Sequence, residues 1–267
     1  MTVADRRARF QALHAGARLF VMPNPWDAGS ARLLASFGFE ALATTSAGFA
    51  LSLGRLDQNV SRDELVAHVE VLAAATPLPL NVDSERLFPD DPGGVGESVA
   101  LLAEAGAAGC SIEDYDPAAN AIDDVAVAAA RVGLAAEAAH RLPAPMVLTA
   151  RAENHLHGVD ELDDTISRLR AYIAAGADCV YAPGLKDLDQ ITAVVQAVGV
   201  PVNVLALRGG PRVSELASVG VRRVSTGSLP AVAAYGVLKA AATELLTDGT
   251  STYGESALSH DELRSAF

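Results

Sequence analysis

Short apolar runs alternate with longer segments of helical periodicity along most of the chain. Eight runs rich in Val, Leu and Ile share this pattern, at residues 18–24, 40–46, 79–85, 109–114, 146–154, 179–184, 202–207 and 223–227. The segments between them repeat apolar residues every three or four positions, as amphipathic helices do. Strands that alternate with helices pair in parallel and are buried on both faces. Eight such units in 267 residues predict an α/β fold, a closed (β/α)₈ TIM barrel.

Two of the helical segments have clear end signals. Ser61 precedes the segment 62–76 as an N-cap, with Glu64 three residues later, as in a capping box. The segment 162–177 has Gly176 near its end, placed as a C-cap. Helices with such ends begin and stop at definite residues.

The C-terminal part of the chain has a different composition from the barrel. A long Ala-rich helix is expected at 229–246, followed by a flexible stretch at 248–254 and a last short helix. We therefore divide the chain into a barrel domain, residues 1–247, and a tether with a C-terminal helix, residues 248–267. A helix on a tether is free to fold back or to exchange with a neighbouring subunit.

Most of the expected strands begin with bland residues and end in polar or charged ones. The strand ends carry Asn24, Asp27, Thr44, Thr45, Ser46, Asp83, Glu85, Glu113, Asp114, Arg151, Glu153, Asn154 and Asn203. In a TIM barrel the carboxyl ends of all strands meet at one rim, and active sites lie there. Residue types alone therefore place these polar groups around a single pocket.

The third and fourth strands end in four carboxylates: Asp83, Glu85, Glu113 and Asp114. Neighbouring strands lie about 5 Å apart, so these carboxylates repel one another unless protons or a cation compensate them. Oxygen ligands select Mg²⁺, Mn²⁺ or Ca²⁺. The alternative is that some of the acids cap helices or pair with Arg86 and Arg151.

Arg151 emerges at the same rim, where its planar guanidinium is suited to a bidentate contact with a carboxylate. A structural salt bridge to Glu113 or Glu153 is the alternative, and the two roles are compatible. The stretch 44–48, "TTSAG", offers small side chains and backbone N–H groups at a strand end, as an oxyanion site requires.

Two further features leave alternatives open. His155 and His157 have the spacing of a zinc-ligand pair, but a solvated loop is the favoured interpretation. The stretches 207–211 and 225–228 follow the seventh and eighth strands, where barrels often bind phosphate through backbone amides. A phosphorylated substrate therefore stays open.

Composition narrows the classes of partner. The formal charge of −13 and the pI near 4.8 argue against nucleic acid and anionic membranes, which both need basic residues. The two cysteines, Cys110 and Cys179, lie in apolar stretches and are expected as buried thiols. We find neither a signal peptide nor an apolar run long enough to cross a bilayer, and we expect a cytoplasmic protein.

The motifs together resemble the isocitrate lyase / phosphoenolpyruvate mutase superfamily over residues from about 10 to 240. The resemblance rests on "VMPNPWDAGSARLL" with "ALATTSAG", then "GRLD", "NVDSE", "GCSIED", "LTARAEN" and "PVNV". Their order and spacing are specific, although each motif alone is loose. The superfamily implies a (β/α)₈ barrel whose last helix swaps between subunits, in homodimers or homotetramers.

The resemblance also implies site residues. Asp83, Glu85 and Glu113 match the positions that bind Mg²⁺ or Mn²⁺, with Glu85 standing where relatives usually have Asp. Arg151 matches the arginine that binds the substrate, a 2-oxo acid. Asp57 falls on the gating loop.

Four more residues match the substrate site of the superfamily. Thr45, Ser46 and Ala47 correspond to the loop that holds the substrate carboxylate or oxo group, and Asn203 matches a rim asparagine. Arg151, Ser46 and Asp57 are the candidate catalytic residues.

The chain departs from the superfamily in two places. The loop at 113–124 lacks the Lys-x-Cys-Gly-His motif of isocitrate-type lyases, and of the mutase loop only Asn120 remains. Pro183 stands where relatives have Glu or His at the sixth strand end. The acid–base residues are reduced, whereas the residues that hold a metal and an oxo acid are kept.

We therefore expect a Mg²⁺-dependent carbon–carbon lyase or decarboxylase that acts on a small 2-oxo or hydroxy dicarboxylic acid, such as oxaloacetate, through a metal-stabilised enolate. Three alternatives stay open: a phosphonopyruvate hydrolase or phosphoenolpyruvate mutase-like enzyme, a non-catalytic 2-oxo-acid-binding protein, and a metal-free phosphosugar barrel.

Overall fold

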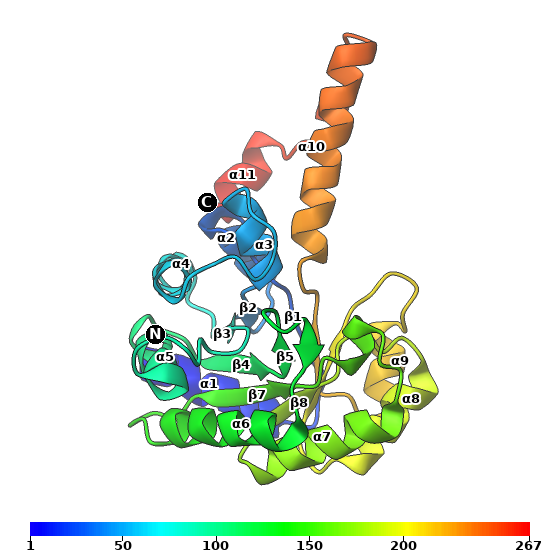
Figure 1. The fold of residues 1–267 in the computed structure, drawn as a ribbon. Coiled ribbons are helices and arrows are strands. Elements are labelled where there is room, and N and C mark those ends of the chain that lie inside the picture. The colour runs from blue at the N-terminus through cyan, green and yellow to red at the C-terminus, as the bar shows by residue number, and fades with distance from the viewer.

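In the computed structural model, which describes residues 1–267, eight parallel strands form a barrel (Figure 1). They are β1 (Phe20–Met22), β2 (Leu42–Ala43), β3 (Leu80–Asp83), β4 (Gly109–Glu113), β7 (Val147–Arg151), β8 (Cys179–Tyr181), β9 (Val202–Leu205) and β10 (Arg223–Ser225). Hydrogen-bonded ladders join them in the order β2-β3-β4-β7-β8-β9-β10-β1. The Ala43 N–H donates to the Pro23 carbonyl at 3.1 Å and links β2 back to β1. The predicted (β/α)₈ barrel is confirmed, and each strand lies within its predicted range.

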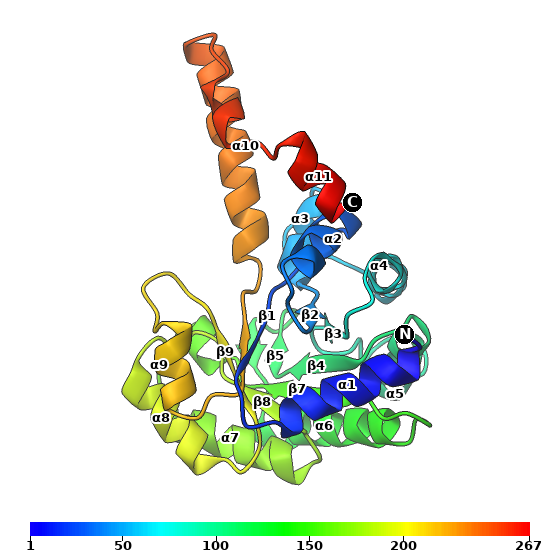
Figure 2. The ribbon, with the colours of Figure 1, turned by 180° about the vertical axis from the view of Figure 1, so that it is seen from behind.

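Helices cover the outside of the barrel (Figure 2). They are α1 (Val3–Ala15), α2 (Ala28–Ser36), α3 (Ser46–Ser52), α4 (Arg62–Ala75), α5 (Gly94–Glu104), α6 (Val125–His140), α7 (Leu162–Ala174), α8 (Leu188–Ala197) and α9 (Val213–Ser218). The capping box of Ser61 and Glu64 is present at the start of α4. Gly176 follows α7 with a φ of 112°, a conformation that suits glycine.

The hydrophobic core has two unequal parts. A cluster of 40 buried residues fills the space between the strands and the helices, whereas only eight fill the space inside the barrel. In the smaller cluster, Phe10 of α1 packs with Phe20 and Val147 near the starts of the strands. Cys110 and Cys179 are buried free thiols, as predicted. Because the apolar filling inside the barrel is small, its carboxyl end is left to polar side chains.

Two local elements differ from the sequence-based expectation. The loop after β4 forms a hairpin of β5 (Tyr115–Asp116) and β6 (Ala121–Ile122). The segment Asn154–His157 forms the 3₁₀ helix η1. The side chain of His155 is only 5% exposed and contacts Thr165, so the prediction of a solvated loop is wrong for this residue.

The C-terminal part begins with α10 (Leu229–Thr247), which projects away from the barrel (Figures 1 and 2). After η2 (Thr252–Ser256), α11 (His260–Ala266) returns to pack on α2. By length and composition alone α10 is long and apolar enough to cross a membrane, so the expectation that no apolar run reaches that length is wrong. Only Ala231 and Ala241 of this helix are buried.

Candidate active site

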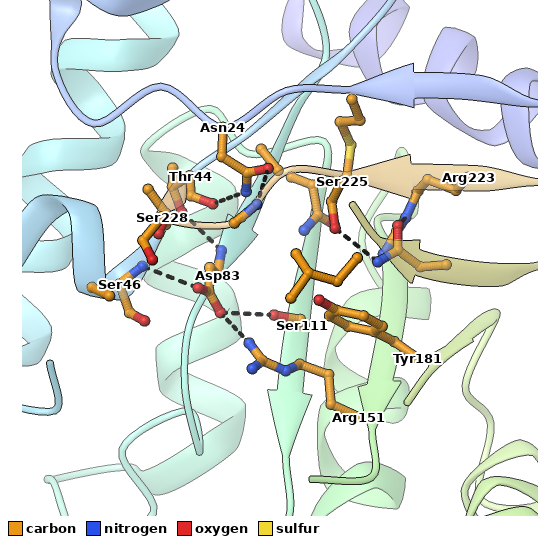
Figure 3. Close-up of a pocket in the computed structure, with 18 of the residues that line it drawn as sticks. Asn24, Thr44, Ser46, Asp83, Ser111, Arg151, Tyr181, Arg223, Ser225 and Ser228 are labelled. Carbon is orange, nitrogen blue, oxygen red and sulfur yellow. Dashed lines mark hydrogen bonds and ion pairs between the residues drawn. The ribbon is translucent and has the colours of Figure 1, made fainter. Parts of the chain in front are cut away.

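A cavity of about 160 Å³ lies at the carboxyl end of the barrel and is lined from every strand or the residues just after it (Figure 3). It brings together seven of the predicted site residues: Thr45, Ser46, Ala47, Asp57, Asp83, Arg151 and Asn203. Glu85 and Glu113 lie beside this lining. Glu113 pairs with Arg151, and the charge of Asp83 acts on both glutamates. The convergence of polar strand ends that the sequence predicted is present.

Asp83 is held in place by four contacts at the end of β3. One carboxylate oxygen accepts a hydrogen bond from the Ser46 N–H at 3.0 Å. The other accepts from Arg151 Nη1 at 2.6 Å and from Ser111 Oγ at 3.4 Å (Figure 3). The Asp83 N–H donates to Thr44 Oγ1 at 2.8 Å. The side chain is therefore fixed before any ligand arrives.

Arg151 is the cation at the centre of the acidic side chains. Its guanidinium lies 2.6 Å from Asp83, 3.3 Å from Glu113 and 2.7 Å from Glu153. Burial would lower the pKa of Arg151, but the charges of Glu153, Glu113 and Asp83 outweigh burial and raise it well above its ordinary value. The salt bridge that the sequence left as an alternative is formed.

The site contains more negative groups than one arginine can compensate. Burial, followed by the charges of Asp57 and Asp83, raises the pKa of Glu85 to about 8. Burial also raises the pKa of Glu113 and Glu153, although Arg151 opposes this in both cases.

Asp57 belongs to the same acidic group. It is exposed as a whole residue, but desolvation of its carboxyl group, followed by the Asp83 charge, raises its pKa. Its neighbour Gln58 donates from Nε2 to Glu113 at 3.0 Å. The loop of residues 54–60 therefore lies over the acids.

The excess of carboxylates over cations is the observation that indicates whether the site could bind a metal ion. No three His, Cys, Asp or Glu side chains converge as a ready-made metal cage, because the Arg151 guanidinium lies between Asp83 and Glu113. The donors are all oxygen atoms, which suit Mg²⁺ or Mn²⁺, and Mg²⁺ uses only one or two direct carboxylates. Burial is the main cause of the raised pKa values of Glu85 and Glu113, and the charges of neighbouring acids add to it. The residues therefore fit a divalent cation.

Asp114 does not join this group, contrary to the expectation of four converging carboxylates. It is buried and accepts hydrogen bonds from Tyr172 Oη at 2.6 Å, from Arg168 Nη1 at 3.2 Å and from the Glu153 N–H at 2.9 Å. Asp114 therefore supports the backbone of a residue that contacts Arg151.

The backbone amides after β10 are already used. Asn24 Oδ1 accepts from the N–H groups of Thr226 and Gly227 at 2.8 and 3.0 Å. These are amides of the kind that a phosphate would need from this loop. The phosphosugar alternative loses support, because the side chain of Asn24 takes these donors.

Several cavity residues were not recognised from the sequence. Ser111, Tyr181 and Arg223 point into the barrel from short strands, and so does Ser225, which was recognised from the sequence only as the first residue of the stretch 225–228. Their signal is a period of two: Arg223 and Ser225 alternate with the buried Val224. In strands of three to five residues, such alternation is difficult to separate from chance.

The hairpin β5–β6 occupies the place of the missing superfamily loop. Asn120, at its tip, accepts from Tyr115 Oη at 2.7 Å. The Tyr115 ring stacks on His157 with ring centroids 3.7 Å apart. Pro183 follows β8 and provides no titratable group.

Comparison with known proteins gives a consistent result. The family model "phosphoenolpyruvate phosphomutase" matches residues 10–246. An oxaloacetate decarboxylase of Bradyrhizobium sp. is 30% identical over 256 residues, covering 90% of this chain and 86% of the relative. A crystal structure from Burkholderia cenocepacia J2315, provisionally named a lyase/mutase, has 51% identity and a TM-score of 0.94, covering 98% of this chain and 95% of the other. A phosphonopyruvate hydrolase crystallised with oxalate and Mg²⁺ shares the fold, with a TM-score of 0.85, 22% identity and coverage of 100% and 95%.

Proposed function

This chain belongs to the phosphoenolpyruvate phosphomutase family, whose relatives include lyases. On that premise we propose that it is a Mg²⁺- or Mn²⁺-dependent carbon–carbon lyase or decarboxylase, and that its substrate is a small 2-oxo or hydroxy dicarboxylic acid. The observation that carries the proposal is the fixed Asp83 carboxylate beside Arg151, within an excess of buried acids. The oxaloacetate decarboxylase relative and the Mg²⁺–oxalate complex of the phosphonopyruvate hydrolase support the same chemistry.

Asp83, with Glu85 and Glu113 close by, would hold the cation. When bound, a divalent cation supplies a Lewis acid that polarises the oxo group of the substrate. Arg151 is placed to bind the substrate carboxylate, because its guanidinium faces the cavity next to Asp83. Ser46 and Ala47 lie at the start of α3, where backbone N–H groups favour negative charge.

The reaction requires little acid–base catalysis. In a decarboxylation, the electron pair of the breaking C–C bond moves onto the 2-oxo group, CO₂ leaves, and the resulting enolate of pyruvate takes a proton at its terminal carbon. No base has to remove a proton first, which fits the loss of the lyase loop and the presence of Pro183. Arg151 stabilises the negative charge that develops near the carboxylate.

An assay of 2-oxo and hydroxy dicarboxylic acids with Mg²⁺ tests this function. We expect turnover of at least one acid, with oxaloacetate the first candidate, and we expect EDTA to abolish it and Mg²⁺ or Mn²⁺ to restore it. Because oxaloacetate also decays without enzyme, an Asp83→Asn variant at equal concentration serves as the blank. No turnover above this blank for any acid in the panel contradicts the proposal. Cleavage of phosphonopyruvate alone would favour the P–C enzyme instead.

We further propose that the protein is a cytoplasmic homodimer or homotetramer in which α10 packs against a second copy of the chain. Most apolar side chains of α10 are open to solvent: Leu229, Val232, Tyr235, Val237, Leu238, Leu245 and Leu246. Leu246 is 88% exposed and Leu238 is 63% exposed. An apolar surface of this kind usually marks a protein contact.

Charged residues on this helix should disrupt the oligomer. A Val237→Glu/Leu238→Glu/Leu246→Glu variant is expected to be monomeric in sedimentation experiments at micromolar concentration, whereas the wild type is a dimer or larger. Val71→Glu, at an exposed apolar position on α4, is the control and should leave the assembly unchanged. A monomeric wild type would contradict the proposal.

A further inference from the structure

Arg223 is a buried cation without an acidic partner. It begins β10, is 2% exposed and lines the cavity. Its Nε donates to Asn203 Oδ1 at 2.9 Å, and its Nη1 lies 3.1 Å from His14 Nε2. Neither partner carries a negative charge, and Nη2 makes no hydrogen bond. Arg151, the other arginine of the cavity, contacts three carboxylates.

His14 cannot compensate the charge of Arg223. Its Nδ1 lies 2.8 Å from the carbonyl oxygen of Phe10, which only accepts, so Nδ1 carries the proton. Nε2 is therefore the acceptor for Arg223. Burial, followed by the Arg223 charge, lowers the pKa of His14 to about 3, so the ring is neutral near pH 7. A buried guanidinium without a counter-ion is costly, and an anion in the cavity would relieve that cost.

The contacts of Arg223 fix the direction of the next hydrogen bonds. Because Arg223 Nε donates, the Asn203 atom that faces it must be the amide oxygen. The amide nitrogen of Asn203 is then turned to Ser225 and donates to its Oγ at 2.9 Å. With its oxygen accepting, Ser225 has its own hydrogen left to donate, either to the nearby Tyr181 hydroxyl or to an anion in the cavity. A hydrogen bond to an anion is the stronger choice.

This donor lies apart from the acidic cluster. Asp83 and Arg151 come from β3 and β7, whereas Ser225 comes from β10, and β8 and β9 separate β10 from β7. Arg151 contacts three carboxylates, whereas Arg223 contacts none. The β10 side of the cavity is therefore the side whose positive charge is uncompensated.

We propose that Arg223, acting through Asn203, positions the Ser225 hydroxyl to bind a negatively charged group on the carbon next to the oxo group of the substrate. In a 2-oxo dicarboxylic acid that group is the second carboxylate. The proposal rests on the proposed function and deepens it, because it names the residues that select a dicarboxylate over a monocarboxylate. Arg223 is a positioning residue, and Ser225 is the residue that contacts the ligand.

The subsite has a kinetic consequence. A carboxylate that departs as neutral CO₂ loses its hydrogen bond to Ser225 as the reaction proceeds, so this contact stabilises the bound substrate more than the transition state. Loss of Arg223 or Ser225 should therefore raise the KM of a decarboxylated substrate more than it lowers kcat. A residue with a merely structural role would not produce this split.

A matched pair of ligands tests the proposal directly. Pyruvate and 3-sulfopyruvate differ by one anionic group on C3, and the sulfonate cannot leave as CO₂. Their dissociation constants are measured by calorimetry with Mg²⁺ for the wild type, Arg223→Met, Arg223→Lys and Ser225→Ala. Arg222→Met is the control, because Arg222 is the adjacent residue and its Nη1 contacts only the Ala17 carbonyl.

We expect the wild type and Arg222→Met to prefer 3-sulfopyruvate. In Arg223→Met and Ser225→Ala this preference should fall at least tenfold, about 1.4 kcal/mol, while pyruvate affinity changes less than about threefold. Arg223→Lys should recover part of the preference. If Arg223→Met does not fold, Ser225→Ala and Arg223→Lys decide.

An unchanged preference in Ser225→Ala, or an equal loss of both ligands in the Arg223 variants, overturns the subsite. A wild type that binds neither ligand overturns the proposed function together with the subsite. If the wild type binds both ligands and the variants prefer 3-sulfopyruvate as strongly as the wild type does, the subsite is overturned but the proposed function is not.

Discussion

Asp83→Asn should lose about 10²–10³-fold in kcat/KM, on the scale of removing a group next to the reacting atoms, while the protein remains folded. The amide keeps the size of the side chain. Its oxygen can still accept from the Ser46 N–H and its NH2 can donate to Ser111 Oγ, whereas the contact with Arg151 Nη1 is lost and Arg151 keeps its pairs with Glu113 and Glu153. The substitution removes one negative charge from a group in which Glu85 already has a pKa near 8. The free energy of unfolding should therefore stay equal or rise, as when a functional charge cluster is relieved.

Steady-state kinetics with Mg²⁺ and urea unfolding measure the two parts of this prediction. Asp90→Asn is the matched control, because Asp90 is exposed and makes no ion pair. A variant with wild-type activity would remove Asp83 from the site. A variant that unfolds would assign Asp83 a structural role.

Arg151→Met should show the opposite effect on stability and the same effect on activity. Methionine fills much of the volume but leaves Asp83, Glu113 and Glu153 without a cation. Breaking a buried ion pair by removing one partner typically costs about 3–5 kcal/mol, and we expect a loss of this order at pH 8. Activity should fall at least as far as in Asp83→Asn.

The stability loss of Arg151→Met should depend on pH with a definite sign. The pKa values of Glu113 and Glu153 are raised in the folded protein, so the native state binds more protons than the unfolded chain. Stability from such groups is present at low pH and is lost as pH rises through their folded pKa. Without Arg151 these pKa values rise further, so the deficit should be smaller at pH 5.5 than at pH 8.

Urea unfolding at the two pH values measures this dependence. Arg18→Met removes an exposed pair with Glu40 and should cost little at either pH. An equal deficit at pH 5.5 and pH 8 for Arg151→Met would contradict the electrostatic explanation.

The barrel could be predicted because its signal repeats eight times. Each apolar run is short, but eight strands that alternate with helices predict a closed barrel. The positions of Asp83, Glu113 and Arg151 at strand ends follow from that fold. The orientation of the Asp114 side chain could not be predicted. Asp114 directly follows Glu113, and only the packing of α7, with Tyr172 and Arg168, turns it away from the cavity.

Part of the inner polar layer was also beyond reach of the sequence. Asn203 was predicted as a rim residue, but Arg223 begins a short strand whose apolar neighbours dominate the pattern, and the pairing of the two residues depends on the register of β9 against β10. The apolar character of α10 was visible, yet its exposure was not, because exposure depends on where the helix lies relative to the barrel. Long-range geometry is what single-sequence patterns lack.

The central claim is that a divalent ion beside Asp83 holds a 2-oxo acid in this cavity. A crystal grown with Mn²⁺ and oxalate tests it most directly, because the anomalous signal of Mn²⁺ identifies the metal. We predict one Mn²⁺ peak in contact with Asp83, with oxalate between the metal and the Arg151–Ser46 side of the cavity. No anomalous peak, with the acids compensated by arginine alone, would contradict the account.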